Sequence, residues 1–170
     1  MASLIDDLIE ILGNEKTQYE KLLDLSESMR DAIVVSDVPK VASITEAEQD
    51  VTTDLQNLDK KRAEIMRNIA LVMNRDSDEF TISAIVDTLD SQPVAKQALS
   101  VVRDDIKELM DRLNRINTQN QALIKQSMEL LEFDLTLYRS MRQAPVTANY
   151  DRSAYNTGAL LGGGGFDAKQ

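Results

Sequence analysis

Three long stretches of this 170-residue chain repeat apolar residues in alternating steps of three and four, the spacing that places side chains on one face of an α-helix. The stretches cover about residues 3–35, 37–73 and 91–141, and the last is on the order of 70 Å long as a straight helix. Each apolar seam must be buried against another. The sequence therefore predicts an all-α fold, an antiparallel bundle of three long helices.

The seams predict the residues of the core. The seam of the first stretch comprises Ile5, Leu8, Leu12, Glu15, Tyr19, Leu22, Ser26, Met29 and Ile33. The seam of the second comprises Val41, Ile44, Glu48, Val51, Leu55, Leu58, Arg62, Ile65, Ile69 and Val72. The first half of the third comprises Ala95, Leu99, Val102, Ile106, Leu109, Leu113 and Ile116. The polar members Glu15, Glu48 and Arg62 are interpreted as contacts that fix the register of the bundle rather than as a partner site. Asn120 admits the same two roles.

A short helix and a tail complete the predicted organisation. Thr81 can cap a short helix that carries Ile82, Ile85, Val86 and Leu89, which we expect to cover the bundle as a small lid. The helical bundle is expected to span residues 1–141, and residues 142–170 to form a flexible tail rich in glycine. The tail carries isolated apolar residues, namely Tyr150, Tyr155, Leu160, Leu161 and Phe166.

The second half of the third stretch carries more apolar surface than a bundle contact requires. Nine of the sixteen residues from Leu123 to Tyr138 are large and apolar, and they cover an arc of roughly 220° where a little over about 100° would suffice. They form two rows. Ridge A comprises Ile124, Met128, Leu131, Leu135 and Tyr138, and ridge B comprises Leu123, Leu130, Phe133 and Leu137.

The two ridges have different predicted roles. On a straight helix, positions seven residues apart shift around the axis by about 20° per heptad. This shift moves the seam of the first half onto ridge A, which we therefore expect to be buried in the bundle. Ridge B is left over and predicts a surface that binds a partner. Burial of ridge B against another helix, or in a homodimer, remains the alternative.

Composition excludes several classes of function. The net charge of −10 and the isoelectric point near 4.5 have the wrong sign for binding nucleic acid. The chain has neither cysteine nor histidine, so it lacks a thiolate nucleophile, the commonest general base and the favoured metal ligand. Paired carboxylates such as Asp6-Asp7 and Asp104-Asp105 fit solvated faces. With no membrane-spanning run and no signal peptide, we expect a soluble, cytoplasmic protein that has no cofactor, metal or catalytic site.

Several segments resemble the FlgN family of flagellar export chaperones. In the first stretch these are Leu8, Glu15, Tyr19, Leu22-Leu23-Asp24-Leu25 and Ala32-Ile33. In the second they are Asp37-Val38, Ile44-Thr45-Glu46-Ala47-Glu48, Leu55, Leu58 and Arg62. In the third they are Leu113, Asn117, Asn120, Leu123-Ile124, Ser127 and Leu130. The resemblance spans roughly residues 4–141, and its motifs are degenerate heptads.

The resemblance implies a non-enzymatic cytoplasmic chaperone. Its partners would be the hook-associated (hook–filament junction) proteins, whose terminal helices it keeps soluble, and components of the flagellar type III export apparatus. In the family the C-terminal helical segment binds the client, which here implies a client-binding set of Leu123, Leu130, Phe133, Leu137, Tyr138 and Met141. The five apolar tail residues are possible secondary contacts. The alternative function is a structural coiled-coil adaptor, such as a stalk-like subunit of an export ATPase complex.

Overall fold

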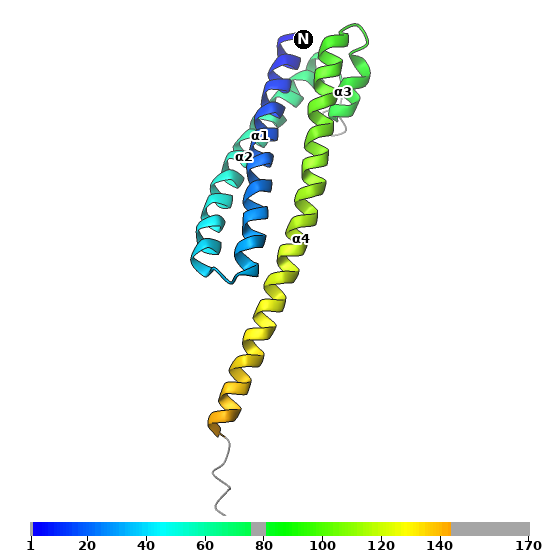
Figure 1. Cartoon of the computed structure of the whole chain (residues 1–170). Helices are drawn as coiled ribbons and strands as arrows, with labels where there is room; N and C mark the ends of the chain where they lie inside the picture. Colours follow the sequence, from blue (N-terminus) through cyan, green and yellow to red (C-terminus); the bar gives the residue numbers. More distant parts are fainter. Residues whose placement is uncertain (1, 76–80, 144–170) are drawn as a thin grey trace, which may run out of the picture. The chain divides into compact units, whose positions relative to one another are not determined.

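A computed structural model describes residues 2–75 and 81–143, and it contains four helices in that part of the chain (Figure 1). They are α1 (Ala2–Val34), α2 (Val38–Val72), α3 (Ile82–Thr88) and α4 (Pro93–Gln143). The predicted all-α class is confirmed, and each helix begins and ends within about two residues of its predicted position. The chain divides into a first unit, Met1–Ser127, and a second unit that begins at Met128, and each unit is described separately below.

Local chemistry explains where the helices begin. Asp37 accepts a hydrogen bond from the Lys40 amide at 3.1 Å, so it caps α2, and Pro39 lies in the first turn, where its missing N–H is not needed. The chain reverses just before this cap at Ser36, which adopts the left-handed conformation with a φ of 56°. Thr81 caps α3 in the same way and accepts from the Ala84 amide at 3.2 Å.

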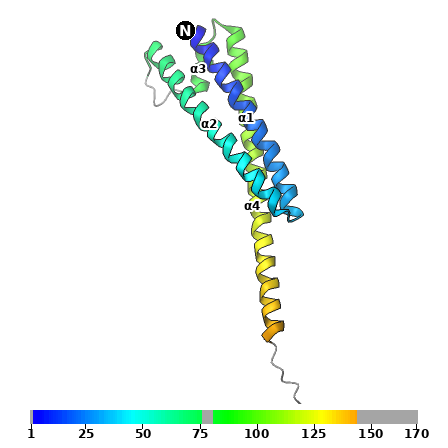
Figure 2. The same cartoon turned by 90° about the vertical axis from the view of Figure 1, so that its left-hand side faces the viewer.

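Within the first unit, α1 and α2 form an antiparallel hairpin, and α1 also packs against α4 (Figures 1 and 2). The core consists of three clusters along this arrangement. The largest joins all four helices and contains Ile5, Leu8, Leu12, Ile69, Ile85, Val86, Leu89, Leu99 and Val102. The middle cluster contains Leu23, Leu109, Leu113 and Ile116. The third lies beside the α1–α2 turn and contains Met29, Ala32, Ile33 and Ile44.

The predicted seams of α1 and α4 are largely confirmed as core, whereas in the seam of α2 only Ile44 and Ile69 are buried and the other members are half-buried or, at Val72, exposed. The α3 residues Ile85, Val86 and Leu89 are buried in the largest cluster, so the short helix covers the bundle as expected. Two details differ. Leu23 and Ala32 are buried although the seam passed beside them, because α1 is contacted by α2 on one side and α4 on another and so buries a wider stripe. Val72 is exposed because it is the last residue of α2.

None of the helices in the described ranges is both long enough and apolar enough to span a lipid bilayer.

Candidate functional site

The polar residues that interrupt the seams of α1 and α2 bond to each other. The Arg62 Nε donates to Glu15 Oε1 at 2.9 Å, and Arg62 also pairs with Asp59 one turn earlier on α2. Glu15 is buried, and this burial raises the pKa of its carboxyl despite the opposing effect of the Arg62 guanidinium. This pair joins α1 to α2, so the prediction that these positions are structural is confirmed.

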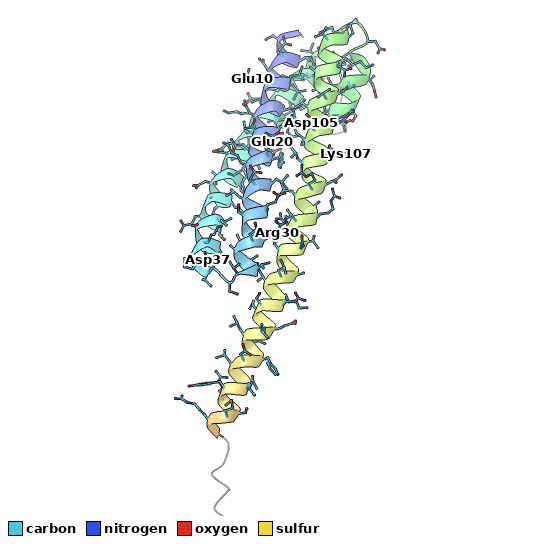
Figure 3. The ribbon with its side chains drawn as sticks, in the orientation of Figure 1. Glu10, Glu20, Arg30, Asp37, Asp105 and Lys107 are labelled. Atoms are coloured by element: carbon cyan, nitrogen blue, oxygen red, sulfur yellow. The ribbon has the colours of Figure 1, made fainter. Side chains whose placement is uncertain are left out.

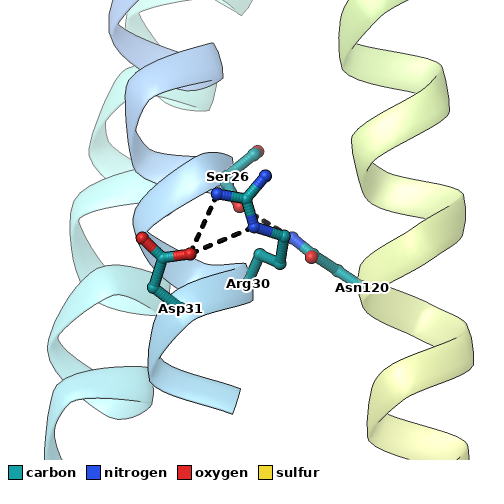
Figure 4. Close-up of polar contacts among 4 residues, drawn as sticks. All are labelled: Ser26, Arg30, Asp31 and Asn120. Atoms are coloured by element: carbon teal, nitrogen blue, oxygen red, sulfur yellow. Dashed lines mark hydrogen bonds and ion pairs between the residues drawn. The ribbon is translucent and has the colours of Figure 1, made fainter. Parts of the chain in front are cut away.

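A second polar layer involves α1, α2 and α4. The Asn120 Nδ2 donates to the backbone carbonyl of Ser26 at 2.8 Å (Figure 4). The Ser26 hydroxyl donates to Glu48 Oε1 at 3.2 Å. Asn120 is only 6% exposed, and its Oδ1 accepts no hydrogen bond from the described residues. These three residues form a polar layer where the apolar seams meet. Glu48 therefore acts within the fold, as predicted, and so does Asn120, for which the sequence left both roles open.

Several charged residues lie on the outside of the first unit. Glu10, Glu20 and Lys107 are exposed, while Asp105 pairs with Lys16 at 2.7 Å and links α4 to α1 (Figure 3). Its neighbour Asp104 is exposed and pairs with Arg103, which lowers the pKa of the aspartate. Among the residues with described positions, no group of His, Cys, Asp or Glu side chains is arranged to hold a metal ion.

The first unit also has a groove of about 440 Å³, lined by residues from all four helices. Its charged side chains include Glu15, Arg62 and Arg103, and each of these already pairs with a neighbour. Tyr19 lies on the wall, and burial raises the pKa of its hydroxyl, which leaves it a poor base or nucleophile at neutral pH.

The second unit differs from the first in burial, because every side chain described from Met128 to Arg142 is exposed. Five members of the predicted client-binding set lie here or at its end, and their exposed fractions range from 48% to 70%. They are Leu130, Phe133, Leu137, Tyr138 and Met141. Arg142 lies over the Tyr138 ring at 5.1 Å, so part of one aromatic face is covered by a cation. Five large exposed apolar side chains on about three turns of helix are more than scattered surface residues explain.

Leu123, the first residue of that set, has a different environment. It is half-buried and packs against the cluster of Met29, Ala32, Ile33 and Ile44. Its side chain therefore contributes to the fold of the first unit. The spacing of ridge B grouped Leu123 with Leu130, but spacing alone does not show where the bundle contact ends along a helix.

Ridge A corrects a prediction. Ile124, Met128, Leu131 and Leu135 are 41–62% exposed, and Tyr138 is 55% exposed, so the expectation that this row is buried in the bundle is wrong. The prediction assumed that another helix packs against every heptad of α4. The spacing of residues within α4 does not show which of its turns are buried.

Some predicted features lie outside the described residues. These include Tyr150, Tyr155, Leu160, Leu161 and Phe166 in the tail. The expectation that residues 142–170 are flexible is likewise not tested beyond Gln143.

Comparison with known proteins adds one finding. A family model described as FlgN protein matches residues 1–157, which includes all four helices. The chain matches no curated protein and no solved structure. The match covers both the first unit and the exposed helical segment after Ser127.

Proposed function

Because this chain belongs to the FlgN family of flagellar export chaperones, we propose that it binds the terminal helices of hook–filament junction proteins through the exposed end of α4. It would keep those helices soluble in the cytoplasm and deliver them to the type III export apparatus. The family is one of chaperones rather than enzymes. The single observation that carries the proposal is the exposure of Leu130, Phe133 and Leu137 in the second unit.

The recognition would be that of an amphipathic helix lying along an apolar row. Leu130, Phe133 and Leu137 follow one another at steps of three and four, which matches the spacing of apolar residues on a client helix. Met141 continues the row by one further turn and is 70% exposed. The proposal requires that the terminal helices of the client carry apolar faces that need cover before assembly. The α4 row could cover such a face.

Charge supports a protein client rather than nucleic acid. The chain carries a net charge of −10, which repels the phosphates of nucleic acid unless salt screens the charges. The exposed end of α4 instead offers apolar side chains, whose removal from water is worth about 25 cal/mol per Å². A partner helix with an apolar face would gain most from this surface.

The test is calorimetric titration of a purified hook–filament junction protein into the full-length chain and its variants. Phe133→Asp and Leu137→Asp should each weaken binding by about 2 kcal/mol or more, as expected for apolar anchors at a hot spot. Thr136→Asp introduces the same charge on the polar face of the same turn, so it is the matched control and should bind normally. The proposal fails if the wild-type chain binds no junction protein, or if all three variants bind equally well.

A further inference from the structure

Helix α4 is packed against the hairpin of α1 and α2 unevenly along its length. Its buried apolar side chains all belong to the largest and the middle clusters, and they are Leu99, Val102, Leu109, Leu113 and Ile116. Among the side chains described from Asn117 to Arg142, only Asn120, Leu123 and Ser127 are not exposed. Leu123 is therefore the last apolar side chain of α4 that is covered, and it is only half-buried.

The third cluster depends little on α4. Its buried members come from α1 and α2, and among the described residues Leu123 is the one member that α4 contributes. The hairpin is also held together here by polar contacts. The Asp37 amide donates to the Ala32 carbonyl at 2.9 Å, and the Ser26 hydroxyl donates to Glu48. These contacts join α1 to α2 without any atom of α4.

A buried polar side chain lies where the packing of α4 changes. Asn120 is buried and reaches from α4 to the Ser26 carbonyl of α1, as Figure 4 shows. Its Oδ1 accepts no hydrogen bond from the described residues. A buried amide with only one of its two groups paired stabilises a contact less than an apolar side chain at the same seam position does. The contact between α4 and the hairpin is consequently weakest from Asn120 onward.

We propose that α4 and the hairpin separate locally from Asn120 to Ser127 in a minority of molecules, while the largest and the middle clusters stay closed. The opening breaks the hydrogen bond from Asn120 to Ser26 and withdraws Leu123 from the third cluster. It disturbs none of the buried members of the other two clusters. Openings of this kind involve one contiguous part of a fold and cost less free energy than global unfolding.

The opening uncovers Ile33 on α1 and Leu123 on α4. The hydrogen bonds that join α1 to α4 connect residues 89 and 94 positions apart. Ile33 and Leu123 are 90 positions apart and share the third cluster, so they lie at the same level of the two helices. Leu123 belongs to the predicted client-binding set, and the opening makes it available to a client. This consequence rests on the proposed function, whereas the opening itself does not.

The chain contains no cysteine, so a single introduced thiol reports on one position. In full-length Ile33→Cys and Leu12→Cys, the rate of labelling by excess dithionitrobenzoate measures how often each buried position reaches solvent. The two positions are three heptads apart on one face of α1, and both are buried. Ile33→Cys should react at least about tenfold faster, because its exposure requires no loss of the largest cluster. Circular dichroism verifies folding, and Ala70→Cys, also at a buried position, replaces Leu12→Cys if that variant does not fold.

Second substitutions identify which contacts break before labelling. Val86→Ala weakens the largest cluster and should speed the labelling of Leu12→Cys about tenfold or more. It should leave the labelling of Ile33→Cys within about twofold of its rate without that substitution. Asn120→Asp should speed the labelling of Ile33→Cys about tenfold or more, because the new carboxylate repels the α1 carbonyl to which the amide donates. Asn117→Asp, at an exposed position of α4, is the matched control and should change neither rate.

Equal labelling rates of the two thiols, or acceleration of both by Val86→Ala, would show that Ile33 reaches solvent only by global unfolding and would overturn the proposal. Labelling of Ile33→Cys that does not respond to Asn120→Asp would also overturn it, because α1 would then fray at its end while α4 stays in place. The experiment contains no client. Its failure therefore leaves client binding at the exposed end of α4 untouched, and failure of client binding leaves the opening untouched.

Discussion

Arg62 on α2 donates to the buried carboxylate of Glu15 on α1, and both residues occupy positions where the seam would otherwise be apolar. A buried ion pair of this kind adds little net stability, because removing two charges from water offsets their attraction. Its geometry is nevertheless specific to one alignment of the two helices. A slip of α2 along α1 would separate the pair and leave the carboxylate buried alone. We therefore interpret the pair as the element that fixes the register of the hairpin.

Lowering the pH should favour the wild-type chain over Glu15→Gln. Burial raises the pKa of Glu15 above its ordinary value of 4.5, so just above pH 4.5 the folded chain holds a proton that the unfolded chain has released. The free energy of unfolding of the wild type should therefore rise relative to Glu15→Gln as the pH falls from 7 to about 5. Urea titrations at several pH values measure this difference, with Glu10→Gln on the surface of α1 as the control. The opposite trend would mean that the attraction of Arg62 outweighs burial.

Asn120→Asp should destabilise the fold by about 2 kcal/mol or more, because it replaces a buried donor to the Ser26 carbonyl with a carboxylate that repels it. The neighbouring carboxylate of Glu48, which bonds to Ser26, adds to the repulsion. Asn117→Asp makes the same change at an exposed position of α4 and should stay within about 0.5 kcal/mol of the wild type. Thermal and urea melts of both variants give the comparison. Equal stability would show that Asn120 is not packed in the bundle.

Neither ridge of α4 should support the stability of the fold. Leu131→Asp, like Phe133→Asp, should change the free energy of unfolding by no more than about 0.5 kcal/mol, because both side chains are more than 60% exposed. Leu113→Asp lies on the same helix but is 7% exposed, and it should lose several kcal/mol or fail to fold. Melts of the three variants separate these outcomes. Unfolding of Leu131→Asp would restore the expectation that ridge A belongs to the core.

Leu123 and Leu130 should respond differently to truncation although they lie two turns apart on one row. Leu123→Ala removes part of the packing against the cluster beside the α1–α2 turn and should cost about 1 kcal/mol, less than a fully buried leucine because Leu123 is only half-buried. Leu130→Ala should leave the melting temperature unchanged. The same two variants in client titrations should show the reverse pattern, with the greater loss of affinity at Leu130. Equal effects on stability would show that the end of the bundle contact is misplaced.

The sequence was sufficient to predict the helices and most of the core. Periodicity, the Asp37 and Thr81 caps and the prolines gave the helix positions, and the polar seam residues Glu15 and Arg62 were correctly interpreted as contacts within the fold. Periodicity could not predict which turns of α4 are buried. Ridge A has the spacing of a buried seam, but burial also requires a neighbouring helix, and the spacing of residues within α4 carries no information on that. The distinction between Leu123 and Leu130 was lost for the same reason.

The exposure of the α4 end also affects how its backbone behaves. From Met128 to Gln143 the helix has no buried side chain among those described, so its conformation there depends on intrinsic propensity and on its own hydrogen bonds. About sixteen residues are close to the length at which an isolated helix is only marginally stable in water. Amide protons in this segment should therefore exchange with solvent much faster than those around Leu113, since opening requires no loss of packing. A partner helix bound along either ridge would slow that exchange. Part of the binding free energy would then stabilise the helical conformation of the α4 end.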